Sequence, residues 1–240
     1  MTTEKMPGCL LLALAHPDDE VGCAGTIAVH RALGVRVVLL FLTRGEMTES
    51  LGPLSAQEVG AARVKHAEQM GRMLDCEVRF LDFADTRIEN NADAVHKVGR
   101  AIAEVKPDAV ITWGDAWMRG MRHPDHQATG EIVRGAITIA RMKRAVAPIQ
   151  PHRGAAAVFT LRDRHSSLPC AAIDVTAQLE KVLAVGRFYK ERVGWPDEAW
   201  LKQRLQMAGW RWGVGAAEEL DAWESVPGLR SSLLGGHLPV

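Results

Sequence analysis

Short hydrophobic runs alternate along the chain with longer segments in which hydrophobic residues recur every three or four positions. The run Val35–Thr43 is rich in β-branched residues and almost continuously hydrophobic, which is typical of a strand covered on both faces. Similar runs predict strands at Cys9–Ala15, Val35–Thr43, Glu77–Leu81, Ala109–Trp113, Ala155–Leu161 and Cys170–Asp174. Helical periodicity predicts helices near Gly22–Leu33, Ser55–Leu74, Asn91–Val105, Asp125–Met142 and Val175–Arg192. This alternation favours an α/β fold, a Rossmann-like, mostly parallel twisted sheet covered by helices on both faces.

Local signals support the predicted helix boundaries. Ser55, followed three residues later by Glu58, predicts a capping box at the start of the second helix. Gly34 lies where a glycine commonly ends a helix, directly before the second predicted strand. Both signals agree with the hydrophobic pattern.

The composition changes near residue 195, where tryptophans become frequent. We expect residues 1–194 to form the main domain and residues 195–240 to form a Trp-rich helix and tail packed on it. The C-terminal segment holds five of the seven tryptophans: Trp195, Trp200, Trp210, Trp212 and Trp223. One interpretation makes them packing anchors; the other makes them the aromatic lining of a substrate pocket or a subunit contact.

Composition excludes several classes of protein. The 240 residues include 29 Lys and Arg and 29 Asp and Glu, so charge offers no reason to expect nucleic acid or an anionic membrane as partner. The first long hydrophobic run, Cys9–Ala15, is far shorter than the roughly 20 residues of a membrane span, and no signal-peptide cleavage pattern follows it. The four cysteines form no C-x-x-C pair, which favours reduced thiols and a cytoplasmic location.

Two polar motifs follow predicted strands. Residues 15–20 read Ala-His-Pro-Asp-Asp-Glu after the first strand, and residues 123–126 read His-Pro-Asp-His after the fourth. With strand order 3-2-1-4, the two motifs meet at the carboxyl ends of neighbouring strands, where open α/β sheets bind ligands. Two histidines and one carboxylate are typical of a catalytic zinc site. The spacing leaves open whether Asp18 or Asp19, and His123 or His126, binds the metal; the plain alternative is that the carboxylates cap helices.

The chain resembles the LmbE-like (PIG-L) family of zinc-dependent N-deacetylases. The resemblance runs from about residue 10 to residue 130 and includes the two motifs, Thr-Arg-Gly-Glu at 43–46, the helix bearing Arg63 and the turn at Asp85. It implies an amide hydrolase that acts on linear C–N bonds other than peptide bonds and removes N-acyl groups from amino sugars or small glycosides. Zn²⁺ would be the metal, one ion per chain, although Fe²⁺ also suits two histidines and a carboxylate.

The resemblance also assigns residue roles. It implies that His16, Asp19 and His126 bind the metal, that Asp18 is the general base, and that His123 steadies the oxyanion. Asp125, two residues away, is expected to orient the His123 imidazole and raise its pKa. Glu46, Arg63 and Asp85 match positions that contact the sugar or its aglycone in family members acting on glycosides. Arg44, on the same rim as Glu46, is expected either to donate hydrogen bonds to the substrate or to form a salt bridge with a neighbouring acid.

Other interpretations remain open from the sequence. One alternative is an enzyme with the same metal site but a different pocket, which would hydrolyse a non-sugar N-acyl amine. Another is a non-catalytic carbohydrate-binding protein, which would keep the metal but would not need Asp18. A nucleotide-binding module is disfavoured because the turn after the first strand lacks G-x-G-x-x-G and carries three acids. Trp113 is expected to pack in the core and Trp117 to stack on a sugar. Related enzymes form trimers or hexamers, so a homo-oligomer is expected.

Overall fold

The sheet follows the predicted order and is almost entirely parallel. The structure, a computed structural model, describes residues 8–115, 122–162 and 165–236. Its strands pair in the order β3-β2-β1-β4-β5-β7-β6-β8, and β7 is the only antiparallel strand among those described. The strands are β1 (Cys9–Leu14), β2 (Arg36–Phe41), β3 (Glu77–Phe80), β4 (Ala109–Thr112), β5 (Ala157–Leu161), β6 (Cys170–Asp174), β7 (Ala217–Glu224) and β8 (Gly228–Arg230). The predicted order 3-2-1-4 is confirmed.

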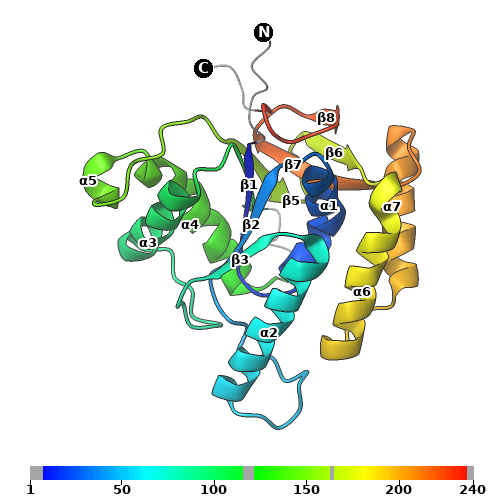
Figure 1. The fold of residues 1–240 in the computed structure, drawn as a ribbon, viewed down its shortest axis with the longest axis horizontal. Coiled ribbons are helices and arrows are strands. Elements are labelled where there is room, and N and C mark those ends of the chain that lie inside the picture. Colours follow the sequence, from blue (N-terminus) through cyan, green and yellow to red (C-terminus); the bar gives the residue numbers. More distant parts are fainter. Residues whose placement is uncertain (1–7, 116–121, 163–164, 237–240) are drawn as a thin grey trace.

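Helices cover both faces of the sheet, as expected (Figure 1). One face carries α1 (Ala24–Ala32), α2 (Ala56–Leu74), α6 (Leu179–Val193) and α7 (Glu198–Trp212). The other carries α3 (Ala92–Val105), α4 (Pro124–Ala140) and α5 (Lys143–Val146). The core lies between these layers: every residue of β1 is buried, and α2 begins with the predicted capping box.

Short 3₁₀ segments precede two of the helices. They span Asp19–Cys23 before α1 and Thr176–Gln178 before α6. The first follows β1 after the turn at residues 15–18 and carries the acidic end of the first motif. The expected helix at Gly22–Leu33 is therefore shorter, and the motif forms its own turn.

The structure corrects the prediction for the end of the chain. Residues expected to form a tail contain β8 at the sheet edge and β7 between β5 and β6. Strand β7 buries two acidic residues, and each has a specific partner. Glu218 accepts hydrogen bonds from the backbone N–H groups of Gly25 and Thr26, while Asp221 pairs with Arg162. These contacts satisfy groups that would otherwise destabilise a buried strand.

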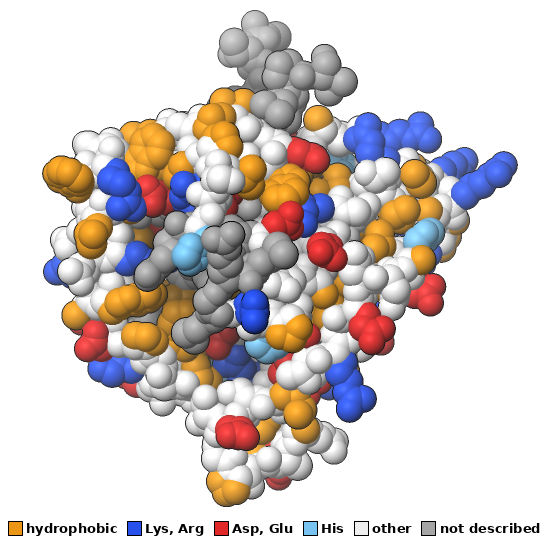
Figure 2. All heavy atoms as spheres, turned by 180° about the vertical axis from the view of Figure 1, so that it is seen from behind, with side chains coloured by type: hydrophobic (Ala, Val, Ile, Leu, Met, Phe, Trp, Pro, Cys, Tyr) orange, Lys and Arg blue, Asp and Glu red, His pale blue; other side chains and the backbone are white. Residues whose placement is uncertain are grey.

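The surface agrees with the balanced composition. Figure 2 shows Lys and Arg side chains interspersed with Asp and Glu on one face, without a stripe of one sign. Within the described residues, no helix is both long enough and apolar enough to span a membrane.

Candidate active site

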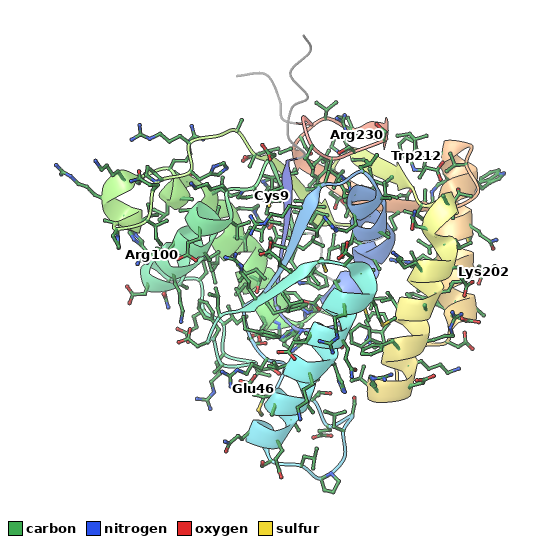
Figure 3. The ribbon with its side chains drawn as sticks, in the orientation of Figure 1. Cys9, Glu46, Arg100, Lys202, Trp212 and Arg230 are labelled. Carbon is green, nitrogen blue, oxygen red and sulfur yellow. The ribbon has the colours of Figure 1, made fainter. Side chains whose placement is uncertain are left out.

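The two polar motifs meet at the carboxyl ends of β1 and β4. These strands are hydrogen-bonded neighbours, and their following segments lead to helices on opposite faces of the sheet. The point where strand order reverses therefore brings residues about 110 positions apart into contact. Figure 3 shows Cys9, at the start of β1, in the upper half of the molecule and Glu46, beyond the end of β2, in the lower half; the site lies on the Glu46 side.

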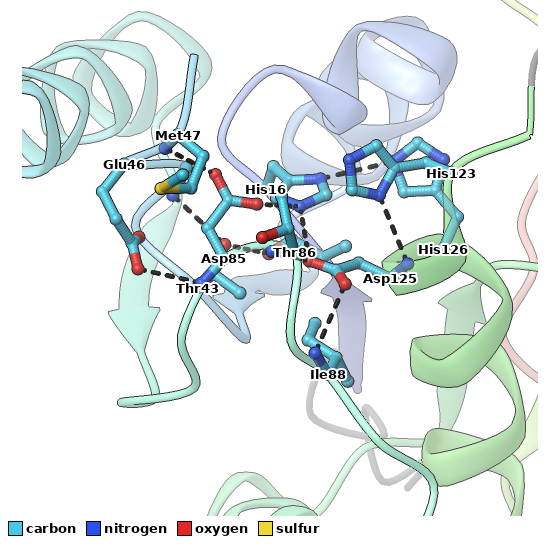
Figure 4. A network of polar contacts seen from close by, with 12 residues as sticks. His16, Thr43, Glu46, Met47, Asp85, Thr86, Ile88, His123, Asp125 and His126 are labelled. Atoms are coloured by element: carbon cyan, nitrogen blue, oxygen red, sulfur yellow. Dashed lines mark hydrogen bonds and ion pairs between the residues drawn. The ribbon is translucent and has the colours of Figure 1, made fainter. Parts of the chain in front are cut away.

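Both ring nitrogens of His16, in the first motif, contact residues outside that motif (Figure 4). Its Nδ1 lies 3.3 Å from Nε2 of His126. Its Nε2 lies 3.0 Å from a carboxylate oxygen of Asp85 and 3.1 Å from one of Asp125. Asp125 is itself fixed because its carboxylate accepts hydrogen bonds from the backbone N–H groups of Thr86 and Ile88. Carboxylates that hold one imidazole nitrogen in this way orient the other toward a metal.

Three hydrogen bonds orient the carboxylate of Asp19. Its Oδ2 accepts hydrogen bonds, each 3.0 Å long, from the backbone N–H groups of Ala15 and His16 and from the indole N–H of Trp113. Its Oδ1 is left facing Nε2 of His126, 3.3 Å away. The Trp113 ring also stacks on the His126 ring, with centroids 3.7 Å apart. Trp113 therefore positions two of the predicted metal ligands.

Two of the separations between predicted ligand atoms match those around a tetrahedral metal ion. Zinc ligands at about 2.0–2.1 Å from the ion lie about 3.3–3.4 Å from one another. The 3.3 Å separations that join His126 Nε2 to His16 Nδ1 and to Asp19 Oδ1 match this spacing. Two sets of three side chains also place ligand atoms within 4.8 Å of one another: His16, His123 and His126; and His16, Asp85 and Asp125.

Burial and neighbouring charges shift the pKa values of these groups. Burial lowers the pKa of His16, but the hydrogen bonds that its Nε2–H donates to Asp125 and Asp85 outweigh burial and raise that pKa to about 10. For Asp19, burial raises the pKa, but the His126 ring and other hydrogen-bond partners hold it well below its usual range. The protein thus holds Asp19 as a carboxylate, which is the form that binds metals.

Asp18 points its carboxylate toward different partners. Its backbone is left-handed, with φ of 99°. Its Oδ2 lies 3.0 Å from the Arg63 guanidinium and accepts a hydrogen bond of 3.3 Å from the indole of Trp195. Burial raises the pKa of Asp18, while the Arg63 charge opposes the shift. Within the described part of the chain, Oδ1 accepts no hydrogen bond.

His123 differs from the expectation in two ways. The Asp125 carboxylate contacts His16, so the expected orientation of His123 by that carboxylate is wrong. Instead, His123 caps α4, and its Nδ1 accepts a hydrogen bond from the backbone N–H of Asp125. The pKa of His123 is lowered rather than raised, first by burial and then by the nearby His16 and His126 rings. A neutral ring that accepts at Nδ1 carries its proton on Nε2 and donates there.

One cavity of about 750 Å³ is lined by His16, Asp18, Asp19, His123 and His126. Among the predicted substrate contacts, Arg63 and Asp85 line it, whereas Arg44 and Glu46 do not. Arg63 is buried against Asp18, and Glu46 accepts a hydrogen bond from the Asp85 backbone, so both also support the site.

The opposite wall of the cavity comes from the C-terminal segment. Trp195 and Trp200 line it, which confirms the pocket-lining interpretation for these two tryptophans. Trp117, which was expected to stack on a sugar, lies outside the described residues.

Sequence reasoning missed the roles of Trp113 and Tyr189. Trp113 was expected only to pack, and its place at the end of a strand beside the switch point was the available signal. Tyr189, buried on α6, donates a hydrogen bond to Glu20 of the first motif. No sequence signal connects residues 169 positions apart.

Comparison with known families agrees with the geometry. The PIG-L model, described as GlcNAc-PI de-N-acetylase, matches residues 11–137, which is more than half of the chain. The chain belongs to the PIG-L family. The matched region contains both polar motifs and every predicted site residue.

Members of this family with related sequences carry deacetylase names. A "Probable N-acetyl-alpha-D-glucosaminyl L-malate deacetylase 2" of Bacillus anthracis is 32% identical over 143 residues, covering 56% of this chain and 62% of the relative. A "1D-myo-inositol 2-acetamido-2-deoxy-alpha-D-glucopyranoside deacetylase" of Nakamurella multipartita is 27% identical over 208 residues, covering 72% and 70%. The chain thus spans less than two thirds of the length of the Bacillus anthracis relative.

Solved structures share the fold. The N,N'-diacetylchitobiose deacetylase of Pyrococcus horikoshii superposes with a TM-score of 0.77 at 24% identity, covering 89% of this chain and 82% of the other. GalB, the 4-carboxy-2-hydroxymuconate hydratase of Pseudomonas putida KT2440, gives 0.76 at 22% identity, covering 89% and 95%. The same PIG-L-like fold therefore occurs in proteins named for different reactions, and the site must decide the chemistry.

Proposed function

We propose that the protein is a zinc-dependent deacetylase that removes the acetyl group from an N-acetylglucosamine-containing glycoside. The observation that carries this proposal is the convergence of His16, His126 and Asp19, with Asp18 in the same cavity. The family match supports the reaction class, and the names of the Bacillus and Nakamurella relatives support the sugar.

The metal would be held by His16 Nδ1, Asp19 Oδ1 and His126 Nε2. This choice is supported by the second nitrogen of His16, which is already engaged by two anchored carboxylates, Asp85 and Asp125. A bound Zn²⁺ supplies an acidified water and polarises the acyl carbonyl. Iron would satisfy the same ligands, so metal analysis of the purified protein decides between the two ions.

Asp18 acts as the general base in this proposal. Its Oδ2 is held by Arg63 and Trp195, which leaves Oδ1 to accept a proton from the attacking water. The same oxygen then returns the proton to the departing amine nitrogen, so one carboxyl group serves as base and acid in turn. The amide C–N bond breaks, and acetate and a free amine form.

His123 donates a hydrogen bond from Nε2 to the oxyanion. The capping interaction at Nδ1 fixes the tautomer, so a neutral ring is sufficient for this role. Single donors of this type contribute about 3 kcal/mol to the stability of a transition state. Asp125 then acts through His16, by orienting its ring.

Mass spectrometry of a substrate panel tests the proposal. The panel contains free N-acetylglucosamine, its malate and inositol α-glycosides, and N,N'-diacetylchitobiose. We expect a loss of one acetyl group from at least one glycoside with the zinc-loaded protein. Asp18→Ala should abolish the loss while zinc content remains unchanged. Hydrolysis of only non-sugar N-acyl amines would favour the alternative substrate class, and full activity of Asp18→Ala would exclude the assigned base.

Metal stoichiometry of single variants tests the ligand set. Asp19→Ala and His126→Ala should lose the metal, whereas His123→Ala should retain it and lose only activity. Asp85→Asn serves as the matched control, because it weakens the support of His16 without removing a proposed ligand. Loss of metal from His123→Ala and retention in Asp19→Ala would instead assign the three-histidine set.

The assembly and location of the protein remain predictions. Light scattering decides whether it forms the expected trimer or hexamer. The absence of a membrane-spanning helix from the described residues leaves the predicted cytoplasmic location to be tested by cell fractionation.

A further inference from the structure

Asp18 has a backbone conformation that its surroundings must maintain. Its φ of 99° and ψ of −18° lie in the left-handed half of conformational space, which residues other than glycine rarely adopt. Its carbonyl accepts a hydrogen bond from the backbone N–H of Val21, and its own N–H donates to the Glu20 carboxylate at 2.9 Å. The Glu20 side chain therefore folds back over the turn and fixes the peptide that carries Asp18.

Glu20 is in turn held from α6. Both Glu20 and Tyr189 are fully buried, and the Tyr189 hydroxyl donates a hydrogen bond of 2.5 Å to Glu20 Oε1. The other oxygen, Oε2, accepts the Asp18 N–H. A buried carboxylate needs its hydrogen-bond partners, because an unpaired one carries a large desolvation penalty. Tyr189 thus fixes which way the Glu20 carboxylate points.

A second donor reaches Asp18 from the segment after α6. The indole N–H of Trp195 donates to Asp18 Oδ2, whereas Glu20 accepts from the backbone N–H of the same residue. Tyr189 and Trp195 both lie beyond residue 137, where the family match ends. The C-terminal part of the chain therefore reaches Asp18 by two routes. Tyr189 acts on the Asp18 backbone N–H through Glu20, and Trp195 contacts the Asp18 carboxylate directly.

We infer that Tyr189 is a positioning residue that acts through Glu20 to hold the Asp18 turn, so that Oδ1 faces the reacting water. This inference rests on the proposed function, because Asp18 is the proposed general base. Among the described residues, Tyr189 does not line the cavity and forms no hydrogen bond with the proposed metal ligands, so its effect on catalysis is indirect.

Steady-state kinetics of Tyr189→Phe test the inference. The substitution removes the hydroxyl and keeps the ring, which packs edge-on against Phe188. We expect kcat to fall about 10–100-fold, as for other residues that orient catalytic groups, while KM and bound zinc stay unchanged. Val182→Ala is the matched control: it lies two turns earlier on α6, is equally buried, and should lower the melting temperature without lowering kcat.

A double-variant cycle and amide exchange separate positioning from general damage. If Tyr189 acts through Glu20, Tyr189→Phe combined with Glu20→Gln should lower kcat by much less than the product of the two single effects. Amide hydrogen exchange of the peptide containing Asp18 should be faster in Tyr189→Phe than in the unmodified protein and in Val182→Ala.

Each outcome bears on the inference. An unchanged kcat and unchanged exchange in Tyr189→Phe would overturn it, as would an equal loss of kcat in Val182→Ala. Inactivity of the unmodified protein on every glycoside would contradict the proposed function instead. Amide exchange would still decide whether Tyr189 holds the Asp18 turn.

Discussion

Replacing Trp113 by phenylalanine isolates one of the hydrogen bonds that orient a proposed metal ligand. The indole N–H donates to Asp19 Oδ2, while the ring stacks on His126. Phenylalanine keeps an aromatic ring against the imidazole but has no N–H. Asp19 would then keep only the backbone donors of Ala15 and His16 on that oxygen.

The expected loss of stability follows from two contributions. Removing a hydrogen bond to a buried charged group costs about 1.5–3 kcal/mol. Trp113 is only 5% exposed, so the smaller ring also leaves a cavity of about 40 Å³, which costs about 1 kcal/mol. The free energy of unfolding should therefore fall by about 2.5–4 kcal/mol. Zinc affinity should fall about 10–100-fold, because Asp19 Oδ1 is no longer held in its direction toward the metal.

Competition with a chromogenic chelator measures the zinc affinity, and urea denaturation of the metal-free protein measures the stability. Thr112→Val is the matched control. It removes a buried hydroxyl, next to Trp113 in sequence, that donates from β4 to the Ala13 carbonyl of β1, and should cost about 1 kcal/mol of stability without changing zinc affinity. Zinc affinity within twofold of the unmodified protein in Trp113→Phe, or an equal loss in Thr112→Val, would refute the orienting role.

Three further predictions concern stability. His30 is buried, with Nδ1 donating to the Thr26 carbonyl and Nε2 accepting from the Leu233 N–H, and burial lowers its pKa below 6.5. The unfolded chain therefore takes up a proton first, and stability should fall as the pH drops below about 6.5; this pH dependence should weaken in His30→Gln, measured by thermal melts. Ser55→Ala removes the capping box with Glu58 and should cost about 1 kcal/mol in urea denaturation, whereas a loss below 0.3 kcal/mol would contradict the capping role. Zinc at about 1,000 times its Kd should stabilise the protein by about 4 kcal/mol and raise the melting temperature by about 8–16 °C, reversibly on chelation; an unchanged melting temperature would argue against the site.

The first half of the fold could be predicted because its signals are local. Strands β1, β2 and β4 are nearly continuous hydrophobic runs, and the Ser55 capping box marks a helix start within four residues. Strand β7 could not be predicted, because its buried acids Glu218 and Asp221 oppose a hydrophobic pattern. Their burial is compensated by hydrogen bonds from the backbone at the start of α1 and from Arg162, which lie far away in sequence.

The candidate site shows the same division. The sequence predicted which residues would meet, because the hydrophobic pattern places the two motifs at the ends of strands. The direction of each side chain depends on local turns that the motifs do not reveal. Asp125 is two residues from His123, but the start of α4 turns its carboxylate toward His16. Sequence proximity was therefore a poor guide to the hydrogen-bond partner.

The segment after residue 137 does more than line the cavity. Its Trp195 and Trp200 line the cavity, and Tyr189 and Trp195 connect to the proposed base from two sides. Relatives that differ in this segment would therefore be expected to differ in turnover as well as in substrate preference. Metal binding should be less sensitive, because His16, Asp19 and His126 are oriented by Asp85, Asp125 and Trp113, all within the region that the family model matches. The proposed metal centre would thus be built by the first 137 residues, whereas the position of the proposed base would depend on the rest.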